Sequence, residues 1–337
     1  MRKWIIKPHE SGLDALTLVD GAIPEPGPGQ VRIAVKAASL NYRDQIILNG
    51  GYGQVITTDT IPASDAAGVI DAVGEGVDSW AVGDDVITVY FADWVDGPPP
   101  TGMGFGLGSP GEDGVLAEYI TLPADRVVAK PKSLDYIQAA TLTCAGLTAW
   151  TALTEEHPVL AGQTVLTLGS GGVSVFALQL AQAMGATVIV TTGGNDKSAR
   201  LIDLGAARVI NYRTDETWGE TAYAATGGAD KVVNAAGGDA MLQSIMAVAN
   251  GGEIAVMGVF SDGDAPPPLP ILMAKGASIR GTAVGGRVAL QRLVEFVDTH
   301  GIAPVIHKVY GFDDVKEAYA AQASPDVFGK VVIAITN

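Results

Sequence analysis

Residues 164–182 read TVLTLGSGGVSVFALQLAQ, an apolar run that stops at a glycine cluster and resumes with helical spacing. The pattern predicts a strand, a tight turn and a helix. Gly169 and Gly171 match the first two glycines of the fingerprint G-x-G-x-x-G, in which the backbone approaches a pyrophosphate at a helix N-terminus. Ser174 stands at the third position, so the fingerprint is imperfect and needs support from its surroundings.

The segments that follow the fingerprint supply this support. Runs rich in β-branched residues alternate with stretches of helical spacing, and glycine closes the first of these helices. The alternation predicts an α/β domain with a doubly wound parallel sheet of the Rossmann type. The predicted elements are strands at 185–192, 207–211, 231–236 and 252–258 and helices at 195–205 and 241–249.

Length and charge narrow the class of protein. A chain of 337 residues is long enough for two domains, each with its own core. The formal net charge of -16 disfavours nucleic acid and anionic lipid surfaces as partners, so local donors must hold an anionic cofactor. No apolar run reaches the ~18 residues that span a bilayer, and residues 1–11 do not resemble a signal peptide. We therefore expect a soluble, cytoplasmic protein without a membrane partner.

The first ~125 residues have a different pattern. Short alternating segments at 30–39, 67–77 and 84–91 are separated by Gly, Pro and Asp, as in a small β-barrel. Residues 97–114 are rich in proline and glycine and predict a long exposed loop. The tail from about 284 predicts one helix at 288–300 and a final strand at 330–335, which we expect to pack on the first domain.

Several motifs, in this order, resemble the medium-chain dehydrogenase/reductases, and among them the zinc-independent branch of quinone oxidoreductase-like and enone reductase-like enzymes. The resemblance covers nearly the whole chain. It implies a GroES-like β-barrel domain at 1–126 and 284–337, a Rossmann NAD(P)-binding domain at 127–283, and a substrate that meets the nicotinamide between them. The motifs are ASLNYRD (38–44), AGVIDAVGEGV (67–77), AVGDDV (81–86), GVLAEY (114–119), CAGLTAW (144–150), LGSGGVS (168–174), GAARVINYR (205–213) and FGKVVI (328–333).

The zinc ligands of related enzymes are incomplete in this sequence. Catalytic zinc needs three protein ligands, mainly thiolate, imidazole and carboxylate. By resemblance, Asn41 stands where zinc-dependent relatives have Cys, and Ser64 and Asp65 stand where they have a His-Glu pair. Cys144 is the only cysteine, which also excludes a four-cysteine zinc lobe and any intrachain disulfide. The sequence therefore predicts no metal, although a site made from Asp65 and Cys144 stays open as an alternative.

Without a metal, hydrogen-bond donors must stabilise the oxygen that gains charge, and this favours an activated alkene or a quinone as hydride acceptor. The resemblance of NYRD and GGYG to cleft-lining motifs assigns catalytic roles to Asn41, Tyr42 and Tyr52. Arg43 and Asp44 are expected to pair with each other in a structural role. The acceptor itself is a small molecule that the sequence does not specify, because the loops at 50–60 and 92–114 would form its pocket.

The end of the second Rossmann strand bears on the choice of nicotinamide cofactor. An acidic side chain there binds the ribose of NAD, whereas a 2′-phosphate requires small or hydroxylic residues with a cation nearby. The strand end is uncharged, Asp196 follows about four residues later, and Lys197 and Arg200 lie in the next helix, which favours NADPH over NADH. With the resemblance, the predicted cofactor residues are Thr148, Gly169, Ser170, Gly171, Gly172, Val173, Thr192, Gly193, Lys197, Tyr212, Gly258, Phe260 and Lys330.

Two further points remain open in the sequence. By resemblance, the strand near 276–284 lies at the edge of the Rossmann sheet and pairs with a second copy, which predicts a homodimer and covers an aggregation-prone edge. Besides an NADPH-dependent, metal-free oxidoreductase, the sequence is compatible with an alcohol dehydrogenase that has an unconventional metal site. It is also compatible with a non-catalytic NADP-binding protein.

Overall fold

A computed structural model describes residues 1–52, 55–258 and 268–335. The chain divides into unit 1, Met1–Leu147 with Gly285–Asn337, and unit 2, Thr148–Val284. The sequence places the first boundary at 126, whereas residues 127–147 belong to unit 1 because β7 (Val127–Ala129) pairs with β5 (Asp85–Thr88). Among the described helices, none is both long and apolar enough to cross a bilayer.

Unit 2 contains a six-stranded sheet in which every pair of neighbouring strands is parallel. The order β10-β9-β8-β11-β12-β13 is the Rossmann order 3-2-1-4-5-6 when the strands are counted along the chain. The predicted doubly wound sheet is therefore confirmed. The strands are β8 (Thr164–Leu168), β9 (Thr187–Thr192), β10 (Arg208–Asn211), β11 (Ala229–Asn234), β12 (Val248–Val256) and β13 (Ser278–Gly281).

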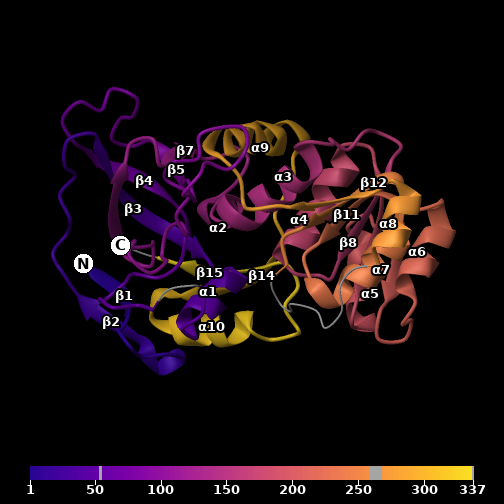
Figure 1. Cartoon of the computed structure of the whole chain (residues 1–337). Helices are drawn as coiled ribbons and strands as arrows, with labels where there is room; N and C mark the ends of the chain where they lie inside the picture. The colour runs from indigo at the N-terminus through magenta and orange to yellow at the C-terminus, as the bar shows by residue number, and fades with distance from the viewer. Residues whose placement is uncertain (53–54, 259–267, 336–337) are drawn as a thin grey trace. The chain divides into compact units, whose positions relative to one another are not determined.

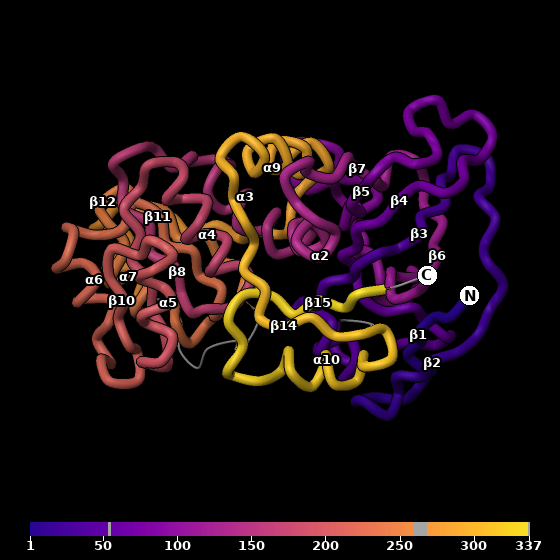
Figure 2. Tube along the Cα trace, turned by 180° about the vertical axis from the view of Figure 1, so that it is seen from behind, coloured from indigo at the N-terminus to yellow at the C-terminus, as the bar shows by residue number. Residues whose placement is uncertain are grey.

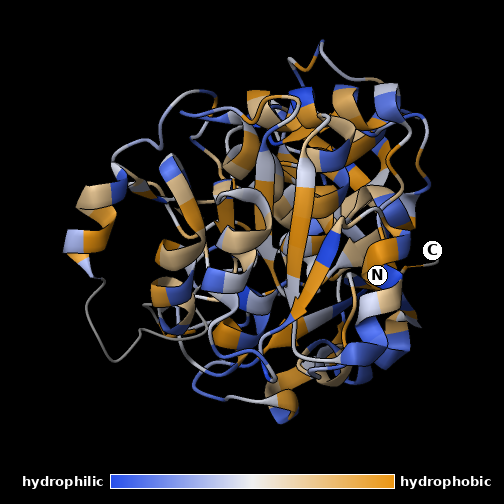
Figure 3. Ribbon diagram, turned by 90° about the vertical axis from the view of Figure 1, so that its right-hand side faces the viewer, coloured by the Kyte–Doolittle hydropathy of each residue, from blue (hydrophilic) through white to orange (hydrophobic). Residues whose placement is uncertain are grey.

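Helices and short 3-10 turns connect these strands. All five residues of β8 are buried, as expected of a central parallel strand covered on both faces. In Figure 3, coloured by hydropathy, the strands are mostly orange, and blue is concentrated on loops and outer helices. The helices of unit 2 are α3 (Leu147–Thr154), α4 (Gly172–Ala183), α5 (Ser198–Asp203), α6 (Trp218–Thr226), α7 (Met241–Ala247) and α8 (Leu269–Lys275), and α3 begins at the last residue of unit 1.

Unit 1 is built around a mainly antiparallel sheet with the order β14-β15-β3-β4-β5-β7, to which β6 is added on β3. The N-terminal β1 (Arg2–Ile6) and β2 (Leu16–Asp20) pair with each other. This domain is of the GroES-like type that the resemblance implies. The further strands are β3 (Gln30–Ser39), β4 (Asp65–Val73), β6 (Tyr119–Pro123), β14 (Ile306–Gly311) and β15 (Lys330–Ala334).

The C-terminal tail returns to unit 1, as predicted, because β15 pairs with β3. Figure 2 shows this yellow strand beside the indigo strands of the N-terminal region. The predicted helix is present as α9 (Arg287–His300), which ends at Gly301 in the left-handed conformation. The tail also holds β14 and a second helix, α10 (Val315–Gln322), which the sequence does not predict because α10 is short and only partly amphipathic.

Two elements of unit 1 position the residues discussed below. Helix α1 (Tyr42–Leu48) lies beside α10 (Figure 1), and Gln45 Nε2 donates a hydrogen bond of 2.7 Å to Tyr319 O. The predicted loop at 97–114 contains no helix or strand and only one isolated bridge, between Ser109 and Glu112. The prediction that the whole loop is exposed is wrong, because residues 106–110 are buried. The short helix α2 (Tyr136–Ala139) precedes a π-helical turn at Leu142–Gly146 that carries Cys144.

Candidate functional site

A buried cluster of polar side chains lies in unit 1 where β3 passes into α1. The pairing of β15 with β3 brings Lys330 to this point, although it is 289 residues from Asn41 along the chain. Lys330 Nζ donates to Leu40 O and to Asn41 Oδ1, each at 2.5 Å. Asn41 is the N-cap of α1, and Asp44 Oδ2 accepts a bond of 2.8 Å from its backbone N–H.

The carboxyl group of Asp65 is the second part of the cluster. Its Oδ1 accepts from Ser64 Oγ at 2.6 Å, and its Oδ2 accepts from the backbone N–H of Cys144 at 3.1 Å. Burial raises the pKa of Asp65, and the opposing effects of Lys330, Asn41, Ser64 and Cys144 do not fully offset it. The residues at the positions of the family's zinc ligands are thus already bonded to one another.

The third part of the cluster is a buried cation between two aromatic rings. The Arg43 guanidinium lies 5.0 Å from the ring centroids of both Tyr52 and Tyr90. It also donates to Leu107 O at 2.7 Å and lies 3.5 Å from Asp44 Oδ1. The expected pairing of Arg43 with Asp44 is therefore present, and Arg43 additionally connects Tyr52 to the rest of the cluster.

Tyr52 is held in an unusual backbone conformation. Its φ of 69° lies in the left-handed region, which is strained for a residue with a large side chain. Its hydroxyl lies 3.2 Å from that of Tyr90, and its ring packs against Phe105 with 5.5 Å between centroids. Strain of this kind persists where the surroundings fix the residue, as Arg43 and Tyr90 do here.

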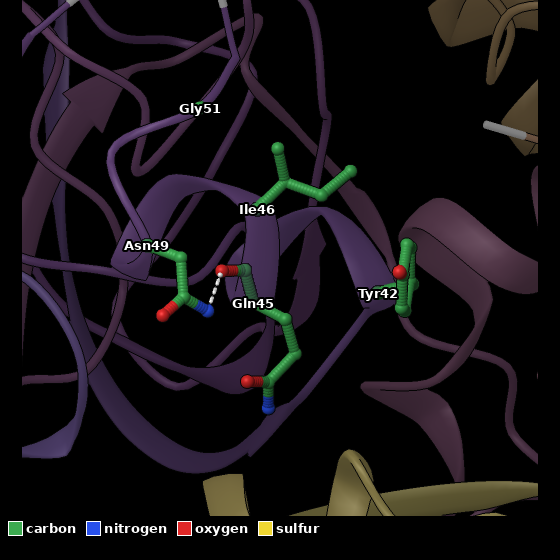
Figure 4. A pocket seen from close by; sticks show the side chains of 5 residues that line it. All are labelled: Tyr42, Gln45, Ile46, Asn49 and Gly51. Atoms are coloured by element: carbon green, nitrogen blue, oxygen red, sulfur yellow. Dashed lines mark hydrogen bonds between the residues drawn. The ribbon is translucent and has the colours of Figure 1, made fainter. Parts of the chain in front are cut away.

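Tyr42, the first residue of α1, is the most exposed of the three predicted catalytic residues. Its side chain is 38% exposed and lines a shallow hollow of about 260 Å³ on the outer face of α1 (Figure 4). The other lining residues are Gln45, Ile46, Asn49 and Gly51, and Asn49 Nδ2 donates to Gln45 O at 2.8 Å. Of the three predicted catalytic residues, the structure links Asn41 and Tyr52 through Asp44 and Arg43, and Tyr42 lines the hollow.

Burial dominates the electrostatics of the cluster. It raises the pKa of Asp44 to about 6, in spite of the neighbouring charge of Arg43. Burial, with a smaller contribution from the charge of Asp65, raises the pKa of the Cys144 thiol far above its ordinary value. Cys144 is therefore a protonated thiol at neutral pH, which disfavours a role as a thiolate.

The glycine turn of unit 2 is built as the fingerprint requires. Gly169 has a φ of 88°, which few residues other than glycine adopt, and a Cβ at Gly169 or Gly171 would meet nothing within 4 Å. The turn is thus open at the N-terminus of α4, the site where helix amides bind phosphates. Ser174 is buried and donates from Oγ to Leu168 O at 2.6 Å, so its hydroxyl finds a partner inside the turn.

The end of β9 carries the residues that face the adenosine end of a cofactor in the resemblance. Thr192 is buried, and its Oγ1 accepts from the Gly194 N–H at 3.4 Å. A Cβ on Gly193 would lie 2.5 Å from the Tyr212 hydroxyl, so these two residues pack together. The Asp196 carboxylate turns back toward the chain that follows β9, because a Cβ on Gly194 would lie 2.3 Å from its Oδ1.

The remaining predicted cofactor residues are placed as follows. A Cβ on Gly258 would lie 2.5 Å from Gly237 N, so close backbone packing requires glycine there. Lys330, as described, bonds to Leu40 and Asn41. Phe260 lies outside the described residues. Thr148 and Ser170 are buried, Gly172 and Val173 open α4, and Lys197 ends the 3-10 turn Asn195–Lys197 before α5.

Comparisons with known proteins identify the family. Residues 27–132 match the model of the alcohol dehydrogenase GroES-like domain, and residues 172–299 match that of the zinc-binding dehydrogenases. A zinc-type alcohol dehydrogenase-like protein of Schizosaccharomyces pombe is 38% identical over 342 residues, 99% of each chain. The zinc-type alcohol dehydrogenase-like protein YogA of Leptosphaeria maculans is 31% identical over 93% of this chain and 92% of its own.

Solved structures agree with this result. A Sinorhizobium meliloti protein with a provisional assignment as an alcohol dehydrogenase is 42% identical, with a TM-score of 0.91 over 99% of both chains. An NAD-dependent alcohol dehydrogenase is 33% identical, with a TM-score of 0.91 over the whole of both chains. The chain belongs to the medium-chain dehydrogenase/reductase superfamily. It is an NAD(P)-dependent oxidoreductase, which removes the non-catalytic binding protein from the alternatives.

The matched family names imply zinc, but the donors present fit it poorly. Within residues 1–52, 55–258 and 268–335, no three His, Cys, Asp or Glu side chains are grouped to hold a metal ion. Both Asp65 oxygens accept hydrogen bonds, and Asn41 Oδ1 accepts from Lys330. A zinc ion would have to displace these bonds and lie near the positive charge of Lys330.

The sequence does not predict the contacts of two members of the cluster, Tyr90 and Lys330, although Lys330 itself is among the predicted cofactor residues. Tyr90 ends an apolar run and looks like an ordinary core residue, although its ring contacts Arg43 and its hydroxyl contacts Tyr52. The contact of Lys330 with Asn41 depends on the return of the tail to β3. Besides the motif FGKVVI, the sequence signal for Lys330 is its place at the start of a strand that is otherwise fully apolar, KVVIA.

Proposed function

We propose that this protein transfers hydride from NADPH to the electron-poor C=C bond of an α,β-unsaturated carbonyl compound, or to a quinone, without a metal ion. The supporting observation is the composition of the unit 1 cluster. The charges of Arg43 and Lys330 oppose, without fully offsetting, the burial that raises the pKa values of Asp44 and Asp65. Within the described residues, the polar groups of the cluster bond to one another and are not arranged as metal ligands.

Such a cluster suits acceptors that need only modest stabilisation of charge. When bound, the nicotinamide would supply a hydride from C4 and be left as NADP⁺. The acceptor carbon would gain this hydride, its π electrons would shift to the oxygen as an enolate or phenolate, and a proton would then be taken up. The Tyr52 hydroxyl and the Asn41 amide are the proposed donors to this oxygen. Arg43 places positive charge beside the Tyr52 ring and so favours the transfer of a proton or a hydrogen bond from its hydroxyl.

NADPH is the proposed cofactor because β9 ends in hydroxyl and glycine residues and because Lys197 and Arg200 follow. The open glycine turn before α4 would accommodate the pyrophosphate. NADH is the second candidate, since the Asp196 carboxylate packs against Gly194 at the same strand end. The similarity to an NAD-dependent alcohol dehydrogenase also favours NADH.

The competing function is that of a zinc-dependent alcohol dehydrogenase, which the names of the relatives suggest. Its zinc ion would bind Asp65 and Cys144, and the hydrogen bonds that Asp65 accepts from Ser64 and from the Cys144 backbone would have to break first. The two functions differ in their dependence on zinc. A zinc-dependent alcohol dehydrogenase loses activity when zinc is removed, whereas the proposed metal-free enzyme does not.

The test is a screen of NADPH and NADH oxidation with quinones, enals, enones and simple ketones, before and after dialysis against EDTA. We expect turnover with at least one activated acceptor, unchanged by the chelator, and zinc far below one ion per chain by elemental mass spectrometry. Activity that EDTA abolishes and zinc restores would establish the alcohol dehydrogenase and reject the proposal.

We also propose that the protein is a homodimer formed through unit 2. Strand β13 pairs only with β12 among the described strands, and Ile279 on it is 37% exposed. Helix α8, next in the chain before β13, exposes Leu269 and Met273. A second copy would cover this edge. Light scattering at micromolar concentration should give twice the chain mass of 34.6 kDa, and the single-chain mass would contradict the proposal.

A further inference from the structure

The orientation of the Asn41 amide is fixed by chemistry. Lys330 Nζ lies 2.5 Å from the amide atom assigned as Oδ1, and an ammonium group has donors but no acceptor. The reverse orientation would place the amide NH₂ against the ammonium with no hydrogen bond between them. The second bond of Lys330, to Leu40 O at 2.5 Å, holds its side chain in place.

The other end of the same amide has no full partner. Asn41 is 7% exposed, and its Nδ2 makes no hydrogen bond of normal geometry to any residue that the structure describes. A side-chain hydrogen bond toward Asp65 helps to lower the pKa of that carboxyl, but it can use only one of the two N–H groups of the amide, so the other remains for a ligand. A buried donor without a partner is destabilising and rare, and a ligand oxygen is one of the groups that can complete it.

Lys330 also differs from an ordinary buried lysine in what it contacts. Both of its hydrogen bonds go to neutral carbonyl oxygens, so its charge is not cancelled by direct contact with a carboxylate. A cation bonded to the oxygen of an amide polarises the whole amide and makes its N–H groups stronger donors. The charge of Lys330 is in this way transmitted to Asn41 Nδ2.

We infer that Lys330 is a positioning residue for hydride transfer: its ammonium orients and polarises the Asn41 amide so that Nδ2 is the donor to the acceptor oxygen. The inference rests on the function proposed above and replaces the cofactor role predicted for Lys330 with a role on the acceptor side. Lys330 thereby supplies a built-in positive charge at the position where zinc-dependent relatives would hold their metal.

The experiment is a double-mutant cycle with Asn41→Ala, Lys330→Met and the combination of the two. We measure kcat and KM for the best acceptor and the Kd of the nicotinamide cofactor. Asn41→Ala should lower kcat by ~10²-fold, the usual loss of an oxyanion donor. Lys330→Met should lower kcat by at least ~10-fold, and the double variant should fall within about twofold of Asn41→Ala, because Lys330 acts through Asn41.

Two further variants distinguish a role of Lys330 in orienting Asn41 from a role in the stability of the fold. Lys330→Arg keeps the charge and the donors and should recover most of kcat, while cofactor Kd should change less than about threefold throughout. Lys231→Met is the matched control, because Lys231 is equally buried but bonds to Glu253 in unit 2. Its kcat per folded molecule should equal that of the unaltered protein.

Each result has a defined meaning. Full kcat in Lys330→Met, or losses that multiply in the double variant, would overturn the inference even if Asn41→Ala is slow. Full kcat in Asn41→Ala would instead overturn the proposed site itself, and the inference with it. Lys330→Met could fail to fold because Asp65 loses its nearby opposite charge. In that case the double variant Lys330→Met with Asp65→Asn, which removes both charges, is compared with Asp65→Asn alone. The expected loss in kcat between these two is again at least ~10-fold.

Discussion

Each unit of the protein buries a lysine, and the two lysines are held in opposite ways. In unit 2, Lys231 Nζ donates to Glu253 Oε1 at 2.5 Å, and Arg280 Nη2 lies 3.2 Å from the same oxygen. In unit 1, the partners of Lys330 Nζ among the described residues are the oxygens of Leu40 and Asn41. The first lysine completes an ion group, whereas the second leaves its charge available to a neutral amide.

The pKa values of the buried carboxyl groups in the two units differ in the same way. Burial alone would raise the pKa of Glu253, but the hydrogen bonds from Lys231 and Arg280 bring it below its ordinary value. For Asp44 and Asp65, burial outweighs the partners, and both pKa values stay raised. Carboxyl groups held in an unfavourable charge state are typical of functional sites, whereas a satisfied ion group is typical of structural ones. The comparison therefore supports the proposal that the cluster of unit 1 takes part in the chemistry and that the triad of unit 2 stabilises the fold.

The largest expected effect is on turnover. Tyr52→Phe should lower kcat by ~10²- to 10³-fold, because it removes a donor to the oxygen that gains charge, and cofactor affinity should stay nearly unchanged. Tyr136→Phe is the matched control, since it removes a tyrosine hydroxyl that bonds to Asp85 outside the cluster. Steady-state kinetics on the best acceptor measures both variants. Equal turnover in Tyr52→Phe and Tyr136→Phe would remove Tyr52 from the site.

The second expected effect is on the stability of unit 2. Lys231→Met leaves Glu253 with Arg280 alone and should lower the free energy of unfolding by about 3 kcal/mol, the low end for breaking a buried ion pair. Urea unfolding measures the loss, with the exposed Lys132→Met as control. A loss no greater than that of Lys132→Met would show that the triad does not stabilise the fold as the comparison requires.

The two regions also differ in what the sequence could predict. The strands and helices of unit 2 follow one another with regular periodicity, and Gly169 marks the turn, so local patterns were sufficient to predict the sheet. The buried cluster of unit 1 depends on contacts between distant segments, such as Lys330 with Asn41. Motif resemblance found Asn41 and Tyr52, but neither periodicity nor resemblance shows how Arg43 and Tyr90 hold Tyr52.

A third effect depends on pH. The pKa of Asp44 is about 6 in the folded protein and about 4 when unfolded, so the folded state binds more protons between these values. Stability from this group is therefore greatest at low pH and falls as pH rises through 6. The difference in unfolding free energy between the unaltered protein and Asp44→Asn should decrease by on the order of 2 to 3 kcal/mol from pH 4 to pH 7.

Urea titrations of both proteins at several pH values measure this difference, and the other titrating groups cancel because both chains share them. The opposite result is a difference in unfolding free energy that is independent of pH or increases with pH. Either outcome would mean that Arg43 offsets the effect of burial on the pKa of Asp44, as Lys231 and Arg280 do for Glu253. The contrast between the two clusters would then be lost.

The smallest expected effect concerns the cofactor in unit 2. The protein should bind NADPH at least tenfold more tightly than NADH, a difference of about 1.4 kcal/mol. Lys197→Ala should reduce the ratio of NADPH to NADH affinity, because it removes a charge-assisted contact to the 2′-phosphate. Lys308→Ala in unit 1 should leave this ratio unchanged. Asp196→Asn provides the opposite test, because a carboxylate at the end of β9 would favour the ribose hydroxyl of NADH. Equal affinities in the unaltered protein, or weaker NADH binding in Asp196→Asn, would make Asp196 and not Lys197 the residue that selects the cofactor.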